Sequence, residues 1–361
     1  MYAYVWLNDC RFPPLGAPAR PRHSPFLTST LLLVAAVKPK YIVGHFDGHG
    51  VSAAAARARS LGVPAERVYS KFPVTGPEQL PDYIDEHFST LAQHDVEIID
   101  IPVNLKDPGT FINAVNRLAA STPAALYDHH ATSRQFAAQM LARVVIFGSG
   151  VEMAEALVDR ENLMLAFVGV VSDRDSSILS RIPRDEVEGE LLPLANKLDI
   201  IVRQDAEKAV RDLASVADPI AYIRGVSAGY PPEALARQVE VRRKGANTVL
   251  VDMTRMPAQQ VAGWGWKVME LVALQHGADY VVAVAEGFDR QASQHVPTVM
   301  VIKYWLSERP SPRPILAPVL GRVAIGHDNA FSVHAADAYD ARSLAERVFD
   351  ELEPAPPRTA R

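Results

Sequence analysis

The chain has 361 residues, of which 48% are hydrophobic and 22% are charged, and its formal net charge is -5. This composition excludes a disordered or fibrous protein, and the acidic balance excludes the basic surface that drives non-specific binding to nucleic acid. The single cysteine, Cys10, excludes a disulfide framework within the chain and a thiolate zinc cluster.

The length predicts two domains, at roughly 150 residues per domain. The apolar run at residues 31–37 lies too deep in the chain for a secretory signal. No run approaches the roughly 18 apolar residues that span a bilayer. We therefore expect a cytoplasmic protein that has no membrane partner.

Short apolar segments alternate with helical stretches over residues 1–185, which predicts an α/β domain with a mostly parallel sheet. The expected elements, in chain order, are a strand at 2–7, a helix at 29–37, a strand at 41–44, a helix at 51–60, and strands at 96–99 and 124–127. The apolar run at 163–171 fits a strand or a helix, because periodicity does not separate the two. The C-terminal end of this run has the same expected position whether the run is a strand or a helix.

Residues 186–246 lose the strand pattern and become amphipathic and charged, which predicts a helical linker. The pattern then returns with expected strands at 249–251, 280–285 and 298–304 and an expected helix at 268–276. It predicts a second, smaller α/β domain over residues 247–353. Proline-rich residues 354–361 should form a disordered tail.

Polar side chains follow the apolar segments of the first domain. The candidate site residues are His45, Asp47, His49, Asp100, Asp128, His129, His130 and Asp173. In open α/β sheets, functional groups gather at the carboxyl ends of the strands, so we expect these side chains to meet. His45, Asp47 and His49 alternate along the chain, which puts them on one face if the chain stays extended.

These donors indicate a metal site. Carboxylates and imidazoles without thiolates suit manganese, iron, cobalt or zinc rather than calcium. Two cations roughly 3.5 to 4 Å apart can activate a water and neutralise a phosphoryl group, and a shared carboxylate would join them. Asp100 or Asp173 alone could instead be a helix cap or turn residue, and Asp175 is an alternative ligand to Asp173.

The run Asp128, His129, His130, preceded by the segment GHFDGHG at residues 44–50 and by Asp100 and followed by Asp173, resembles the DHH family of phosphoesterases. The resemblance covers most of the first 185 residues. It implies one cation bound by His45 and Asp47, a second bound by His49, His129 and Asp173, and a bridge formed by Asp100. It also implies that His130 faces the substrate phosphate and that Asp128 orients His129.

One position departs from the family pattern. The family usually has aspartate where this chain has His49. A neutral imidazole removes one negative charge from the site, so the second cation should be held differently. Manganese remains the expected metal, with iron, cobalt and zinc as alternatives, and reduced or lost activity is a further alternative.

The second domain resembles the smaller substrate-binding domain of one branch of this family. Residues 321–330 resemble its glycine-rich loop, in which only Gly326 and His327 match closely. A glycine backbone can approach a phosphate closely, and Arg322 and His327 can donate hydrogen bonds to it. A surface hairpin is the alternative. We expect His334 in the core or at the surface. Trp264 and Trp266 would stack a base or form a buried pair, and we favour the pair.

Together these features predict a two-metal phosphodiesterase that hydrolyses short or single-stranded nucleic acid or small nucleotides with metal-activated water. The acidic net charge favours small substrates over long duplexes. A pyrophosphatase or polyphosphatase, and a catalytically degenerate binding protein, remain alternatives. The expected partner is the nucleotide substrate, and homodimer formation stays open.

Overall fold

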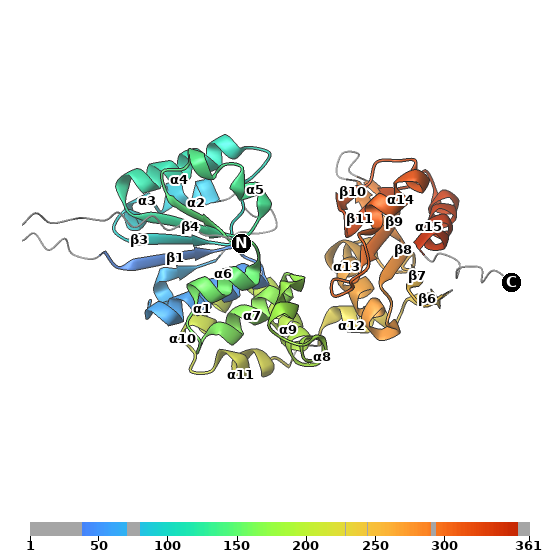
Figure 1. Ribbon diagram of the computed structural model, residues 1–361, viewed down its shortest axis with the longest axis horizontal. Coiled ribbons are helices and arrows are strands. Elements are labelled where there is room, and N and C mark those ends of the chain that lie inside the picture. Colours follow the sequence, from blue (N-terminus) through green and yellow to red (C-terminus); the bar gives the residue numbers. More distant parts are fainter. Residues whose placement is uncertain (1–37, 71–79, 228, 244, 290–293, 353–361) are drawn as a thin grey trace, which may run out of the picture. The chain divides into compact units, whose positions relative to one another are not determined.

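The computed structural model describes residues 38–70, 80–227, 229–243, 245–289 and 294–352. The strand expected at 2–7, the helix expected at 29–37 and the tail expected at 354–361 lie outside the described residues. Within the described part, the chain forms a parallel and a mixed sheet, each packed against helices (Figure 1), so the predicted α/β class is confirmed. None of the described helices has the length and apolar character needed to cross a membrane.

The first sheet is parallel throughout. Its strands are β1 (Lys40–Gly44), β2 (Val68–Tyr69), β3 (Asp95–Ile99), β4 (Ala124–Asp128) and β5 (Arg143–Ile146). They lie in the order β2-β1-β3-β4-β5. Gly44 is opposite Ile99, which is opposite Tyr127, so β1, β3 and β4 end at the same edge. This register brings residues 45, 100 and 128 together.

Helices cover both faces of this sheet (Figure 1). One face carries α2 (Leu80–Glu86), α3 (Phe88–Leu91) and α4 (Pro108–Ser121), and the other carries α1 (Gly48–Leu61), α6 (Gly150–Leu157) and α7 (Leu163–Ser172). Because side chains alternate along a strand, Ile42 packs into the cluster on the α1 face and Val43 into the cluster on the α2 face.

The apolar run at 163–171 is a helix and not a strand. Every residue of α7 from Leu165 to Ser172 is buried, and α7 packs against α1 and against α9 (Leu192–Gln204). A helix that is surrounded on all sides is apolar all round and has no polar stripe to reveal its period. Asp173 therefore follows a helix. The strands that end at candidate site residues are β1, β3 and β4.

Residues 184–243 are mostly helical. The elements are α8 (Arg184–Glu186), the π-helix η5 (Val187–Leu191), α9, α10 (Ala206–Ser215), α11 (Pro219–Arg224), α12 (Pro231–Ala236) and the strand β6 (Glu240–Arg243). Helix α10 packs on α1 through its buried Ala209, Val210 and Leu213. The boundaries proposed at 185 and 247 stay a prediction.

Short elements complete the first part of the chain. They are η1 (Ala65–Arg67), α5 (Ala131–Arg134), η3 (Ala137–Gln139) and η4 (Ser176–Ser180). Helix α5 begins directly after His130, so the Asp-His-His run occupies the turn between β4 and α5.

The second sheet is mixed. It contains β6, β7 (Thr248–Asp252), β8 (Tyr280–Asp289), β9 (Gln294–Lys303), β10 (Ile325–His327) and β11 (Ala330–His334). The order is β10-β11-β9-β8-β7-β6. Among the described strands of this second sheet, β7 and β8 form the only parallel pair. The strands expected in this region are confirmed. The helix expected at 268–276 begins earlier, as α13 (Ala258–His276).

The two faces of the second sheet are covered differently. Helices α14 (Pro312–Leu320) and α15 (Ala338–Leu352) bury one face, where Phe331 and Val333 of β11 are fully buried. Helix α13 packs on the other face, mainly against β8. The β9–β11 side of that face is therefore less covered by helix.

Candidate metal centre

Asp100 is the central residue of the candidate site. It follows β3 in a left-handed backbone conformation with φ 63°, which non-glycine residues seldom adopt. Its backbone N–H donates to the Tyr127 carbonyl at 2.8 Å, and its side chain is 1% exposed. In this conformation the backbone departs from the extended course of β3, so the carboxylate does not take the direction that it would have in a strand. Backbone strain of this kind is common at functional sites.

The first motif turns from strand to helix. His45 follows β1, Asp47 caps α1 by accepting a hydrogen bond from the Gly50 N–H at 2.9 Å, and His49 lies in the first turn of α1. The expectation of one extended run is therefore wrong, although the three side chains still gather. A Cβ on Gly50 would lie 2.4 Å from the His45 Cβ, so glycine is required where the helix meets the loop.

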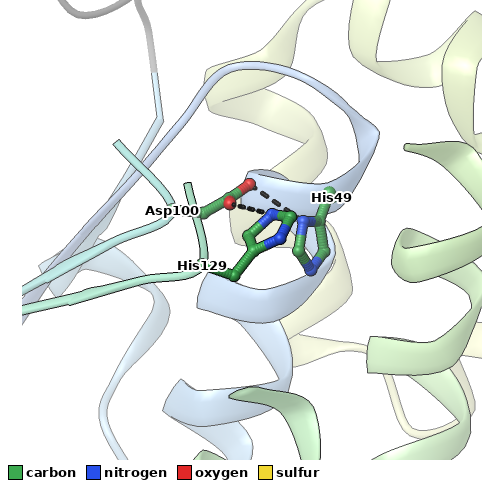
Figure 2. Close-up of side chains that lie close together, drawn as sticks. All are labelled: His49, Asp100 and His129. Atoms are coloured by element: carbon green, nitrogen blue, oxygen red, sulfur yellow. Dashed lines mark ion pairs between the residues drawn. The ribbon is translucent and has the colours of Figure 1, made fainter. Parts of the chain in front are cut away.

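His49 and His129 both contact the Asp100 carboxylate. The His49 Nδ1 lies 3.1 Å from one oxygen and the His129 Nε2 lies 3.1 Å from the other. Figure 2 shows both rings pointing toward Asp100. Asp173 completes this group, since its Oδ2 lies 3.7 Å from the His129 Nε2 and 4.0 Å from the His49 Nδ1.

A second group of donors shares Asp100. The His45 Nδ1 lies 2.7 Å from the Asp47 Oδ2. In the group His45, Asp47 and Asp100, and again in the group His49, Asp100 and His129, one donor atom from each residue lies within 4.8 Å of the others. A carboxylate common to two donor sets is the arrangement that a bridged pair of cations requires.

Asp128 orients His130 and not His129. Its Oδ1 lies 2.7 Å from the His130 Nδ1 and accepts the backbone N–H of His129 at 2.8 Å. Its Oδ2 accepts a hydrogen bond from Ser133, a residue that our reading of the sequence missed. Because Nδ1 of His130 is engaged by Asp128, only Nε2 of that ring remains for another contact.

The electrostatics of the cluster depend on its burial. Burial opposes the charged form of His49, but Asp100 and then Asp173 raise its pKa to about 10. Burial acts against the ionised Asp100 as well, yet His49 and His129 hold its pKa well below the usual range. Burial raises the pKa of Asp173 to about 6. Buried groups that perturb one another in this way are typical of functional sites.

Four buried donor atoms in this cluster have no hydrogen-bond partner of acceptable geometry among the described residues. They are His45 Nε2, His49 Nδ1, Asp100 Oδ1 and His129 Nε2. A buried polar atom without a hydrogen bond is costly, so several of them in one cluster indicate a missing binding partner. Imidazole nitrogens and carboxylate oxygens without a thiolate fit divalent cations such as manganese, iron, cobalt or zinc.

A cavity of about 820 Å³ adjoins the cluster. Its lining includes Phe46, Asp47, His49, Asp173, Asp199 and Arg203. Asp199 accepts a hydrogen bond from the Ser172 hydroxyl at 2.5 Å, and both lie beside Asp173. Neither residue carries a signal in the sequence, because the contact joins two helices that are far apart along the chain.

Asp175 does not replace Asp173 in the cluster. One of its oxygens accepts the Gly150 N–H at 2.7 Å and the other accepts the Ser177 N–H at 2.9 Å. Both oxygens therefore hold backbone at the starts of α6 and η4.

The residues expected to bind substrate phosphates lie in or before the β10–β11 hairpin. Gly326 and His327 are on β10, with Gly326 opposite Phe331, and their side chains are outside the described part of the structure. Arg322 is exposed and donates to Asp340, with Nη2 2.9 Å from Oδ1. A role for these three residues in binding substrate stays a prediction.

Comparisons with known proteins find similarity in structure but not in sequence. No family model and no curated protein sequence matches the chain. The pGpG-specific phosphodiesterase PggH from Vibrio cholerae is similar over 88% of this chain and 100% of its own, with 13% identity and a TM-score of 0.50. RecJ in complex with Mn²⁺ from Thermus thermophilus matches 88% of this chain and 52% of its own, with 17% identity and a TM-score of 0.46.

The similarity to PggH concerns the fold. The chain shares with PggH a two-part fold, in which a parallel-sheet unit that carries the Asp-His-His run precedes a smaller unit with a mixed sheet. This is the fold that the sequence resemblance implied.

Proposed function

We propose that this chain is a phosphodiesterase that uses two divalent cations, manganese first among them, to hydrolyse small nucleotides or short single-stranded nucleic acid. The observation that carries the proposal is the position of Asp100, whose buried carboxylate belongs both to the donor set of His45 and Asp47 and to that of His49 and His129. Several buried imidazole nitrogens and one carboxylate oxygen that lack hydrogen bonds of acceptable geometry within the described part of the chain support a bound cation at this carboxylate.

Each donor has a place in this proposal. His45, Asp47 and Asp100 would hold one cation, and His49, Asp100, His129 and Asp173 would hold the other. When bound, the two cations would supply the Lewis acidity that activates a water and neutralises charge on the phosphoryl group. Asp128 fixes the ring of His130 by its Nδ1, which leaves Nε2 to donate to a phosphate oxygen or to the leaving oxygen.

A small substrate fits the charge and the cavity. The chain carries a net charge of -5, which disfavours long polyanions. The 820 Å³ cavity lies within the range of sites that enclose small ligands. PggH, which shares the fold, is described as specific for pGpG, so linear dinucleotides are the first substrates to test.

The test is a metal-by-substrate screen. Purified protein would be incubated with manganese, iron, cobalt or zinc and with linear dinucleotides, cyclic dinucleotides, short single strands, pyrophosphate and polyphosphate. The proposal predicts cleavage of a phosphodiester that depends on the added metal. Phosphate release from pyrophosphate or polyphosphate without nucleotide hydrolysis would support the pyrophosphatase alternative instead.

A catalytically degenerate binding protein is the second candidate, and His49 is the observation that favours it. This imidazole is fully buried at the position where the family usually has a carboxylate, so the donor set has one negative charge fewer. A protein that neither retains metal nor gains thermal stability from manganese would fit this reading.

A further inference from the structure

A second cavity, of about 450 Å³, lies wholly within the second sheet unit. It is formed by α13 and by one face of β8, β9 and β11. Thr298 and Met300 of β9 line it beside their partners across the strands, His334 and Ser332 of β11. The intervening residues of both strands point to the opposite face and pack under α14 and α15. The cavity therefore occupies the part of the sheet that α13 leaves less covered.

The lining of this cavity is mostly apolar, with a few polar groups among the apolar side chains. Among the described residues that line it, none is Asp, Glu, Lys or Arg. Its hydrogen-bonding groups are the Gln259 amide, the hydroxyls of Thr298 and Ser332, and the imidazoles of His295 and His334. The cavity beside the metal cluster, in contrast, is rich in carboxylates. The described part of the lining lacks the arginine and lysine side chains that commonly bind phosphates, so this second cavity suits an uncharged ligand.

An aromatic surface and a glycine shape the cavity. Trp266 lines it from α13 and is half-buried, so part of its indole remains open to a ligand. A Cβ on Gly287 of β8 would lie 2.4 Å from the Thr298 Oγ1, and glycine therefore keeps this part of the lining open. The Thr298 hydroxyl donates to the Val296 carbonyl at 3.0 Å, which leaves its oxygen as an acceptor toward a ligand.

We propose that this cavity binds a nucleobase. A nucleobase is a neutral planar heteroaromatic ring with both donors and acceptors at its edge, and it stacks on indole in many single-strand binding proteins. The cavity volume lies within the usual range for small-ligand sites. The inference rests on the proposed function, for which this cavity would recognise a nucleoside of the substrate.

The test uses the full chain freed of metal with EDTA, so that the candidate metal centre does not contribute to binding. AMP, GMP and CMP would be titrated by calorimetry, with ribose 5-phosphate as the ligand that lacks a base. We expect at least one mononucleotide to bind more tightly than ribose 5-phosphate. Base stacking on an aromatic ring contributes about 1 to 3 kcal/mol, so Trp266→Ala should weaken binding about fivefold or more, whereas Trp266→Phe should retain most of it.

A second variant tests the inference independently, in case Trp266→Ala does not fold. Ala262 lines the cavity from an exposed position of α13, so Ala262→Phe should fill it without disturbing the core. Gln260→Phe, on the exposed surface of the same helix but outside the lining, is the matched control and should bind as wild type does. Unchanged melting temperatures would show that the variants are folded.

Two outcomes overturn the inference without touching the proposed function. One is the absence of base-dependent binding in the folded wild type. The other is a chain that cleaves a dinucleotide with a KM that neither Trp266→Ala nor Ala262→Phe changes. Conversely, binding that Trp266→Ala abolishes, in a chain that cleaves no phosphodiester with any metal, would support the base site and contradict the proposed function.

Discussion

The His49 Nδ1 lies 3.1 Å from the Asp100 carboxylate, and both side chains are 1% exposed. The imidazole therefore occupies the interior of the cluster and aims at the residue that the two donor sets share. A cation bound between His49 and Asp100 would replace this direct contact. The strength of the contact between His49 and Asp100 should therefore affect the affinity of the chain for its second cation.

Replacing His49 by aspartate should strengthen metal binding. His49→Asp adds a negative charge to the second donor set, and affinity for divalent cations rises with the charge of the ligands. We expect the manganese dissociation constant of the weaker site to fall about tenfold, measured by calorimetry. His49→Asn, which is of similar size but neutral, is the control. Equal affinities for the two variants would show that charge at this position is unimportant.

Loss of the Asp128 carboxylate should impair turnover and spare the metals. Asp128→Asn keeps the shape of the side chain but weakens its hold on the Nδ1 of His130. Groups that orient a functional histidine typically contribute about 10-fold to 100-fold, so kcat should fall by that factor at unchanged metal content. Metal content would be measured by elemental analysis beside kcat and KM. A loss of bound metal would instead assign Asp128 to metal binding.

The metal-free protein should lose stability as the pH rises. Against the effect of burial, Asp100 and Asp173 raise the pKa of His49 from 6.5 to about 10 in the folded state. A raised folded-state pKa contributes stability that is complete below the unfolded value and is lost as pH rises through the folded value. Melting temperatures in EDTA should therefore fall between pH 6.5 and about 10, and less steeply for His49→Gln. Parallel curves for both proteins would refute this assignment.

Arg322 provides a test of the predicted phosphate loop. Its guanidinium now donates to Asp340, an exposed pair that contributes little to stability. If Arg322 binds a substrate phosphate, Arg322→Ala should raise KM about tenfold with kcat unchanged, whereas Asp340→Ala should not raise KM. Equal effects of the two substitutions would mean that only the pair itself matters.

The sequence predicts the strand ends well because a parallel sheet aligns them. Asp100 and Asp128 each follow or close an apolar strand, and the common register of β3 and β4 places both residues at one edge. The same alternation of apolar segments predicts β1, β3 and β4 of the first sheet and β7, β8 and β9 of the second. It misses the strands β2, β5, β6, β10 and β11, most of which are short or lie at an edge of their sheet. The outline of the site therefore follows from local pattern and sheet topology together.

Other features depend on tertiary contacts that no local pattern carries. The apolar run that became α7 lacks a polar stripe because α1 and α9 cover it. Asp128 turned toward His130, since the chain bends into α5 directly after the run. Trp266 of α13 lines the same cavity as Gly287 of β8, where a side chain would meet Thr298 of β9. Each outcome depends on segments distant in the chain.

Metal stoichiometry of Asp100→Asn tests the central claim most directly. Asparagine keeps the size of the side chain but cannot bridge two cations as a carboxylate does. We predict that bound manganese falls from two ions per chain to one or none and that phosphodiester turnover falls about 10³-fold. Asp175→Asn, a nearby acid whose oxygens hold backbone, is the control and should keep both ions. Two bound ions and wild-type turnover in Asp100→Asn would contradict the account.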